Sequence, residues 1–136
     1  MNSELKEIIK EKCDFTKNTI TVEMLKQAEE LVGVKFGTQL IEYILEYGYL
    51  GFEDIEFHGI NSKQGLNSDL LEKTLNLHNY FEKTKPYIAF ELISEHIYSL
   101  IDTDDNIYIY NDVENTLKPL NKKLFEYIVD RIKGDE

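Results

Sequence analysis

The stretch YIAFELISEHIYSLIDTDDNIYIYN, residues 87–111, decides the fold class of this chain. It holds three short runs rich in β-branched and aromatic residues, YIAFELI, IYSLID and NIYIYN, separated by short polar segments. Runs of this kind, bounded by turn-forming residues, are typical of strands with short connections. We therefore predict an antiparallel meander. In its last run isoleucine alternates with tyrosine, so Ile107 and Ile109 would point to the face opposite Tyr108.

Upstream of the meander, the apolar residues recur with the period of amphipathic helices. Ser3, Thr21 and Thr38 are candidate N-caps, and Gly33 suits the left-handed position at a helix end. Between these helices and the meander, DIEFHGI alternates like a half-buried strand. The predicted upstream helices cover residues 3–13, 21–32, 38–48 and 67–81.

Downstream of the meander, an apolar stripe that includes Leu124 and Ile128 predicts a closing helix over 121–133, with Asn121 as its cap. The predicted fold is therefore α+β: N-terminal helices, an antiparallel β-sheet meander, and a C-terminal helix packed on the sheet. The 136 residues contain no repeat and no Gly/Ser/Pro-rich linker. We expect one domain over residues 1–136.

Composition limits the classes of partner. The chain has 15 Lys and Arg against 26 Asp and Glu, a formal net charge of −11. This charge disfavours direct binding to nucleic acid or to anionic membranes and favours a basic partner, although acidity also serves solubility alone. The charged first residues and the single cysteine, Cys13, indicate a cytoplasmic protein with no export signal, membrane span or internal disulfide.

The negative charge is unevenly distributed along the sequence. Residues 36–62 contain no Lys or Arg but five Asp and Glu, and residues 91–114 contain no Lys or Arg but seven. Charge segregation of this kind favours one anionic face if the two segments meet in the fold. The sequence does not show whether they meet.

Motifs for catalysis or metal binding are not found. The three histidines fall in different predicted elements, with no second ligand at zinc spacing. Asp102, Asp104 and Asn106 resemble the start of a calcium loop, but Ile107 replaces its glycine and Val113 its bidentate glutamate, so a β-turn is predicted instead. No GxSxG or phosphate-binding glycine motif occurs. We predict no catalytic residue, no cofactor, no metal and no enzyme.

The segment YGYLGF, residues 47–52, interleaves aromatic rings with glycine directly before acidic residues. One interpretation is a tight turn whose rings fold back into the core. The other is an exposed aromatic rim beside Glu53, Asp54 and Glu56, where rigid rings and carboxylates together would suit an interface with a cationic partner.

The order of these motifs resembles the SUKH superfamily of Smi/Knr-type domains. ITVEMLKQAEELVGVKF is similar to the helix of that family with an Ala–Glu pair and a following hydrophobic–Gly pair, and LIEYILEYGYLGF to the next helix, which ends near Tyr47 and Gly48. IEFHGI resembles the following strand, IYSLIDTDDNIYIY the strand pair around an Asp-rich turn, and LKPLNKKLFEYIVDRI the terminal helix. Gly37 departs from a frequent proline, and the frequent Trp is absent.

This resemblance implies a bacterial immunity protein that neutralises a cognate polymorphic toxin, often a nuclease. An acidic face could bind a basic nuclease domain and occlude its active site. The alternative is a non-enzymatic regulatory or scaffold domain that binds another protein, because the family also includes eukaryotic cell-wall regulators. The predicted partner-binding residues are Tyr49, Glu53, Asp54, Glu56, Asp104, Asp105, Tyr108 and Asp112.

Overall fold

The computed structural model describes residues 1–18, 20–61 and 63–134, and its fold is α+β, as predicted. The described α-helices are α1 (Ser3–Lys12), α2 (Val22–Val32), α3 (Thr38–Glu46), α4 (Asp69–Tyr80) and α5 (Leu124–Lys133), with 3-10 turns η1 (Gly65–Asn67) and η2 (Glu82–Thr84). The described strands are β1 (Asp14–Lys17), β2 (Tyr47–Phe52), β3 (Ile55–His58), β4 (Ile88–Ser94), β5 (Ile97–Ile101), β6 (Asn106–Asn111) and β7 (Thr116–Lys123).

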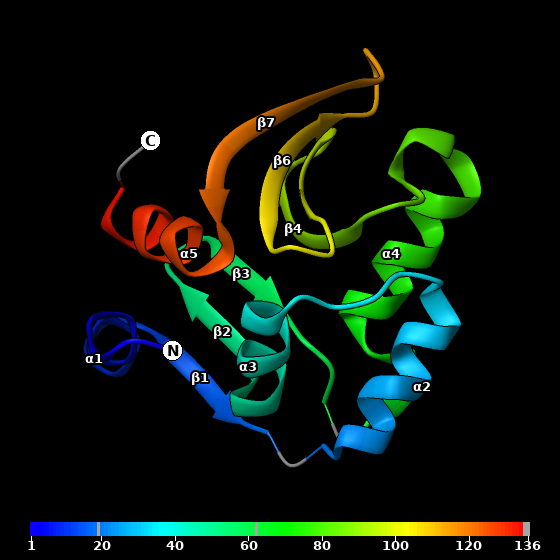
Figure 1. The fold of residues 1–136 in the computed structure, drawn as a ribbon. Coiled ribbons are helices and arrows are strands. Elements are labelled where there is room, and N and C mark those ends of the chain that lie inside the picture. Colours follow the sequence, from blue (N-terminus) through cyan, green and yellow to red (C-terminus); the bar gives the residue numbers. More distant parts are fainter. Residues whose placement is uncertain (19, 62, 135–136) are drawn as a thin grey trace.

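The strands form two antiparallel sheets rather than one. One sheet has the order β1-β2-β3 and the other the order β4-β5-β6-β7. The predicted meander supplies β4, β5 and β6, and the predicted turn at residues 102–106 joins β5 to β6. In Figure 1, α5 lies between β7 and the three-stranded sheet, while α4 stands beside the four-stranded sheet and α2 packs against α4.

One hydrophobic core joins the two sheets. Phe57 of β3 and Phe90 of β4 stack with ring centroids 5.1 Å apart, and the Tyr43 ring of α3 meets Phe90 edge-on at 5.3 Å. A second, smaller cluster lies on the other side of the four-stranded sheet, where Leu77 of α4 packs near the fully buried Tyr110. The alternation of Ile and Tyr in β6 therefore serves two cores, one for each face.

Sequence analysis missed three strands, β1, β2 and β7. β7 has the sequence TLKPLNKK, in which proline and lysines oppose strand formation in a central position. As the outer strand of its sheet, however, β7 can tolerate Pro119 and benefits from lysines that discourage edge-to-edge pairing. The predicted start of the last helix at Asn121 is wrong for the same reason: Asn121 lies within β7, and α5 begins at Leu124. β1 is only four residues long.

The helix caps were predicted with mixed success. Thr21 caps α2, accepting from the Met24 backbone N–H at 3.2 Å, and Gly33 ends that helix with φ +74°, both as predicted. The first helix is capped by Asn2, not Ser3, because the Asn2 side chain reaches the Leu5 backbone N–H at 2.9 Å. Thr38 does not cap α3, whose N-cap is Gly37.

The segment YGYLGF is neither a tight turn nor an exposed rim. It forms β2, the central strand of the three-stranded sheet, in which Tyr47 and Leu50 are buried. The helix before it ends at Glu46, so Gly48 is a strand residue and not the helix stop. No helix in the described part of the chain is both long enough and apolar enough to cross a membrane.

Candidate partner-binding surface

The eight predicted partner-binding residues lie in three separate places. Tyr49, Glu53, Asp54 and Glu56 belong to the β2–β3 hairpin; Asp104, Asp105 and Tyr108 lie at the β5–β6 turn; Asp112 follows the far end of β6. α5 starts near the β5–β6 turn, where Lys123 contacts Asp104, and ends beside Glu53, so about 15 Å of helix separates the first two places. The residues do not form one continuous face.

The β2–β3 hairpin presents four of these residues on or beside the outer face of its sheet. Strand register places Gly51 between Asp14 of β1 and Glu56 of β3. Residues directly opposite one another in neighbouring strands share a face, so the Asp14 and Glu56 carboxylates flank Gly51 on the same side. Leu50 and Phe57 point the other way, into the core.

Gly51 provides the space for Tyr49 on this face. A Cβ atom at position 51 would lie only 2.3 Å from the Tyr49 hydroxyl, so the tyrosine ring crosses the glycine. Partial burial raises the pKa of Tyr49, and the nearby Glu56 and Asp14 carboxylates raise it further. The hydroxyl therefore remains protonated at neutral pH, and it is hydrogen-bonded with the Glu56 carboxylate.

Two exposed carboxylates, Asp14 and Glu56, lie near this tyrosine, and two more, Glu53 and Asp54, follow in the β2–β3 turn. We define the acidic sheet face as Asp14, Tyr49, Glu53, Asp54 and Glu56. Within residues 1–18, 20–61 and 63–134, none of its carboxylates takes part in a salt bridge. Their charge is therefore not neutralised by a neighbouring Lys or Arg. Sequence analysis missed Asp14 because no strand was predicted at residues 14–17.

His58 borders the acidic sheet face but adds no positive charge at neutral pH. Its Nε2 lies 3.0 Å from the Lys73 ammonium group and its Nδ1 lies 3.6 Å from the Asp69 carboxylate. Burial lowers the pKa of His58, and the Lys73 charge lowers it further, outweighing the opposite effect of Asp69. The face thus stays anionic.

At the β5–β6 turn, Asp105 is a structural residue. Asp105 is only 3% exposed. Its two carboxylate oxygens accept hydrogen bonds from the backbone N–H groups of Gln39 and Leu40, each at 3.0 Å. These bonds satisfy the N-terminus of α3. They also join the two segments without Lys or Arg, which therefore meet in the fold. We leave Asp105 out of the proposed contact residues.

Asp102 organises the same turn. Burial alone would raise the pKa of Asp102, but backbone hydrogen bonds from Asn106 and Asp104, with side-chain bonds from Asn106 and Tyr108, lower it. The Tyr108 hydroxyl, at 3.0 Å from Asp102, is engaged in this network. Of the predicted residues at this turn, Asp104 is the exposed carboxylate.

A groove of about 850 Å³ lies between the two sheets and shares Phe52, Glu53 and Ile55 with the hairpin. Tyr127 and Arg131 of α5 line it, and both contact the buried Glu91 carboxylate. That carboxylate is thereby neutralised and held in place. Among the described residues, no three His, Cys, Asp or Glu side chains gather as potential metal ligands.

The fold and this surface define an α+β protein with two antiparallel sheets, a helix between them and an acidic, aromatic-containing sheet face. A family model described as SUKH_5, SMI1-KNR4 cell-wall, matches residues 1–133. The chain belongs to the SMI1-KNR4 family of the SUKH superfamily, as its motif order predicted. This membership is compatible with an immunity-protein role. Comparison with curated proteins gives no match.

Proposed function

We propose that this protein is a bacterial, cytoplasmic immunity protein that binds a cognate polymorphic toxin domain stoichiometrically and neutralises it. The toxin is a nuclease whose basic substrate-binding surface is covered by the acidic sheet face. The observation that carries this proposal is the set of four exposed carboxylates of the acidic sheet face, none of which forms a salt bridge with another described residue. The protein acts by contact, with no catalytic step, cofactor or membrane association of its own.

Two physical effects support this assignment. A nuclease must hold polyanionic substrate, so its active-site surface is basic, and opposite charges accelerate the encounter of the two proteins. After encounter, Tyr49 offers a rigid ring beside Asp14 and Glu56, and tyrosine is a residue type that often contributes strongly to interfaces. Asp104 extends the same negative potential at the other end of α5.

The test uses the toxin domain encoded beside this gene. Purified protein should form a 1:1 complex with it and block its nuclease activity, with an association rate constant that falls as salt rises. The triple variant Asp14→Lys, Asp54→Lys, Glu56→Lys should lower the association rate at low salt by about tenfold or more and flatten its salt dependence.

The matched control is Glu23→Lys, Glu30→Lys, Glu72→Lys, which makes the same change in net charge at exposed positions of α2 and α4. It should retain more than half of the wild-type association rate. Equal effects of the two triple variants would show that net charge, and not the acidic sheet face, attracts the toxin, and would contradict this placement of the interface.

A regulatory scaffold domain is the second candidate, favoured by the cell-wall description of the matched family model. It predicts that affinity capture from the native host recovers a cell-wall or signalling protein and that no toxin gene adjoins this one. A 1:1 complex with a neighbouring toxin would exclude this candidate as the main function.

A further inference from the structure

A small pocket lies between the C-terminal end of α4 and the β4–β5 hairpin, away from the acidic sheet face. Its volume is about 210 Å³. We call it the turn pocket and define it by its lining residues Lys73, Asn76, Leu77, Tyr80, Phe81, Leu92 and Tyr98. Tyr80 is 79% exposed and Leu92 is 42% exposed. A cluster of large apolar side chains that are exposed to solvent is typical of an interaction site.

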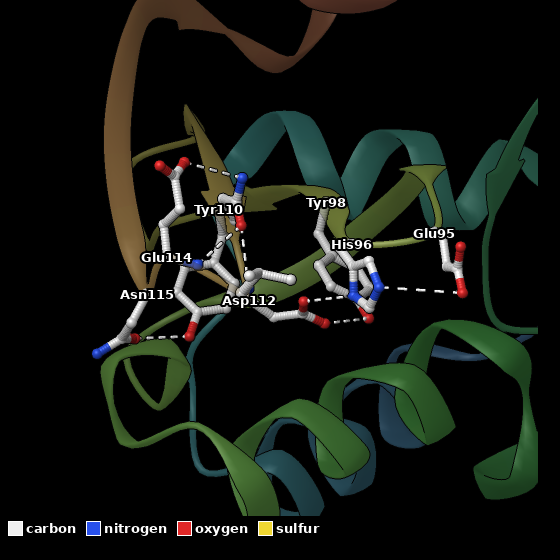
Figure 2. Close-up of polar contacts among 9 residues, drawn as sticks. Glu95, His96, Tyr98, Tyr110, Asp112, Glu114 and Asn115 are labelled. Carbon is white, nitrogen blue, oxygen red and sulfur yellow. Dashed lines mark hydrogen bonds and ion pairs between the residues drawn. The ribbon is translucent and has the colours of Figure 1, made fainter.

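A carboxylate adjoins the aromatic wall of the turn pocket. The Tyr98 hydroxyl donates to Oδ2 of Asp112 at 3.2 Å, and Nδ1 of His96 lies 2.7 Å from Oδ1 (Figure 2). The Asp112 backbone N–H also donates to the His96 carbonyl at 3.1 Å, which ties the two turns together. The Asp112 side chain is 12% exposed, and because a carboxylate can accept about four hydrogen bonds, its oxygens can take a further bond where they reach the surface.

The surroundings of Asp112 are acidic and partly apolar. Glu95 and Glu114 are exposed on the same two turns, and Val113, which follows Asp112, is 70% exposed. No Lys or Arg occurs in the sequence from residue 91 to residue 114, while Lys83 of η2 donates to the Asn115 carbonyl at 2.8 Å, three residues beyond Asp112. Lys73 lines the pocket, but its ammonium group is 3.0 Å from His58 Nε2, so its charge is directed to the three-stranded sheet.

We propose that the turn pocket receives one arginine side chain of the protein partner, with the guanidinium against the Tyr98 ring and hydrogen-bonded to Asp112. Arginine fits because its stem can cover Tyr80 and Leu92, while its planar cation stacks on aromatic rings and pairs with carboxylates. A neutral apolar side chain would add no hydrogen bond to Asp112 beyond those from His96 and Tyr98, and an acidic side chain would be repelled. Asp112 thus acts apart from the other predicted contact residues.

This inference rests on the proposed function only for the identity of the partner, so its test needs no toxin. Full-length, ¹⁵N-labelled protein is titrated with N-acetyl-arginine amide and followed by NMR. The isosteric neutral compound N-acetyl-citrulline amide and the lysine analogue serve as comparison ligands. Arginine should cause saturable shifts at the amides of Leu92, Tyr98 and Asp112 with a dissociation constant in the millimolar range, typical of about one anchored side chain.

Citrulline should bind at least about tenfold more weakly, because it lacks the charge. Asp112→Asn and Tyr80→Ala should each weaken arginine binding about fivefold or more, and neither disturbs a buried apolar contact. Glu56→Gln, on the acidic sheet face, removes the same charge as Asp112→Asn and should leave arginine binding unchanged.

Equal binding of citrulline, or unchanged binding by Asp112→Asn, would overturn the pocket as an arginine site. Lysine binding as tight as arginine would overturn the choice of a guanidinium. Failure here leaves the toxin complex and its dependence on the acidic sheet face intact, whereas failure of the toxin experiment would not alter the NMR result. The two experiments therefore test the two proposals independently.

Discussion

Asp105 shows how one side chain can set the position of a helix. It combines a left-handed backbone, with φ +68°, and a buried carboxylate that accepts from the first turn of α3. The helix otherwise has Gly37 as N-cap, with no side-chain cap of its own. Gly37 is required here because a Cβ atom at this position would lie 2.4 Å from Oδ1 of Asp105.

We predict that Asp105→Asn lowers the free energy of unfolding by about 2 kcal/mol. Asparagine tolerates the left-handed conformation but replaces one acceptor oxygen with a donor that faces a backbone N–H. Urea denaturation measures the loss. Asp104→Asn changes the same charge in the same turn at an exposed side chain and should cost less than about 0.5 kcal/mol. Equal losses from the two variants would contradict the capping role.

At the scale of elements, Glu91 links β4 to α5. Its side chain is 2% exposed, and it accepts from the Tyr127 hydroxyl at 2.5 Å and from Nε of Arg131 at 3.1 Å. The hydrogen bond to Glu91 raises the pKa of Arg131, so the guanidinium stays charged. Removal of only one partner would leave a charge without compensation inside the structure.

Arg131→Met should therefore lower the free energy of unfolding by about 3 kcal/mol, whereas the double variant Glu91→Leu, Arg131→Met should lose less than that single change. A thermodynamic cycle from urea denaturation gives the coupling energy. Lys133→Met is the control, because the Lys133–Glu4 pair is exposed and should contribute less than about 1 kcal/mol. A double variant less stable than Arg131→Met would refute this account of how α5 is held.

At the scale of the whole molecule, the two sheets share one main core. Phe57 and Phe90 come from different sheets, and Tyr43 binds both: its ring contacts Phe90 and its hydroxyl donates to the Phe57 carbonyl at 3.1 Å. A substitution that weakens this contact should therefore destabilise both sheets. We therefore expect the sheets to unfold together, as one cooperative unit.

Phe57→Leu tests this expectation. The substitution should cost about 1–2 kcal/mol, because leucine fills most but not all of the space. Native-state hydrogen exchange should then show the same loss of protection for the most protected amides of β2 and of β5. Val22→Ala, at a residue 61% exposed, is the control and should change neither. Loss of protection confined to β1, β2 and β3 would show that the sheets unfold independently.

The arrangement of the proposed partner-binding residues could be predicted only in part, and their role stays a prediction. Local sequence located the acidic residues, and three of them, Glu53, Asp54 and Glu56, lie in the same β2–β3 hairpin as Tyr49. Asp14 was missed because a four-residue strand has too short a pattern to recognise. Asp105 was misjudged because a carboxylate in a turn has the same sequence signal whether it faces solvent or caps a distant helix.

The sequence by itself determined the α+β class, the family, the meander of β4, β5 and β6, and the cap of α2, because each depends on short-range periodicity or on motif order. Only the tertiary structure decided that YGYLGF is a central strand and that TLKPLNKK is an edge strand. These outcomes depend on which strands pair, and pairing is set by burial against residues far away in sequence. The same long-range contacts brought the two segments without Lys or Arg together at Asp105 and left Asp112 beside the turn pocket.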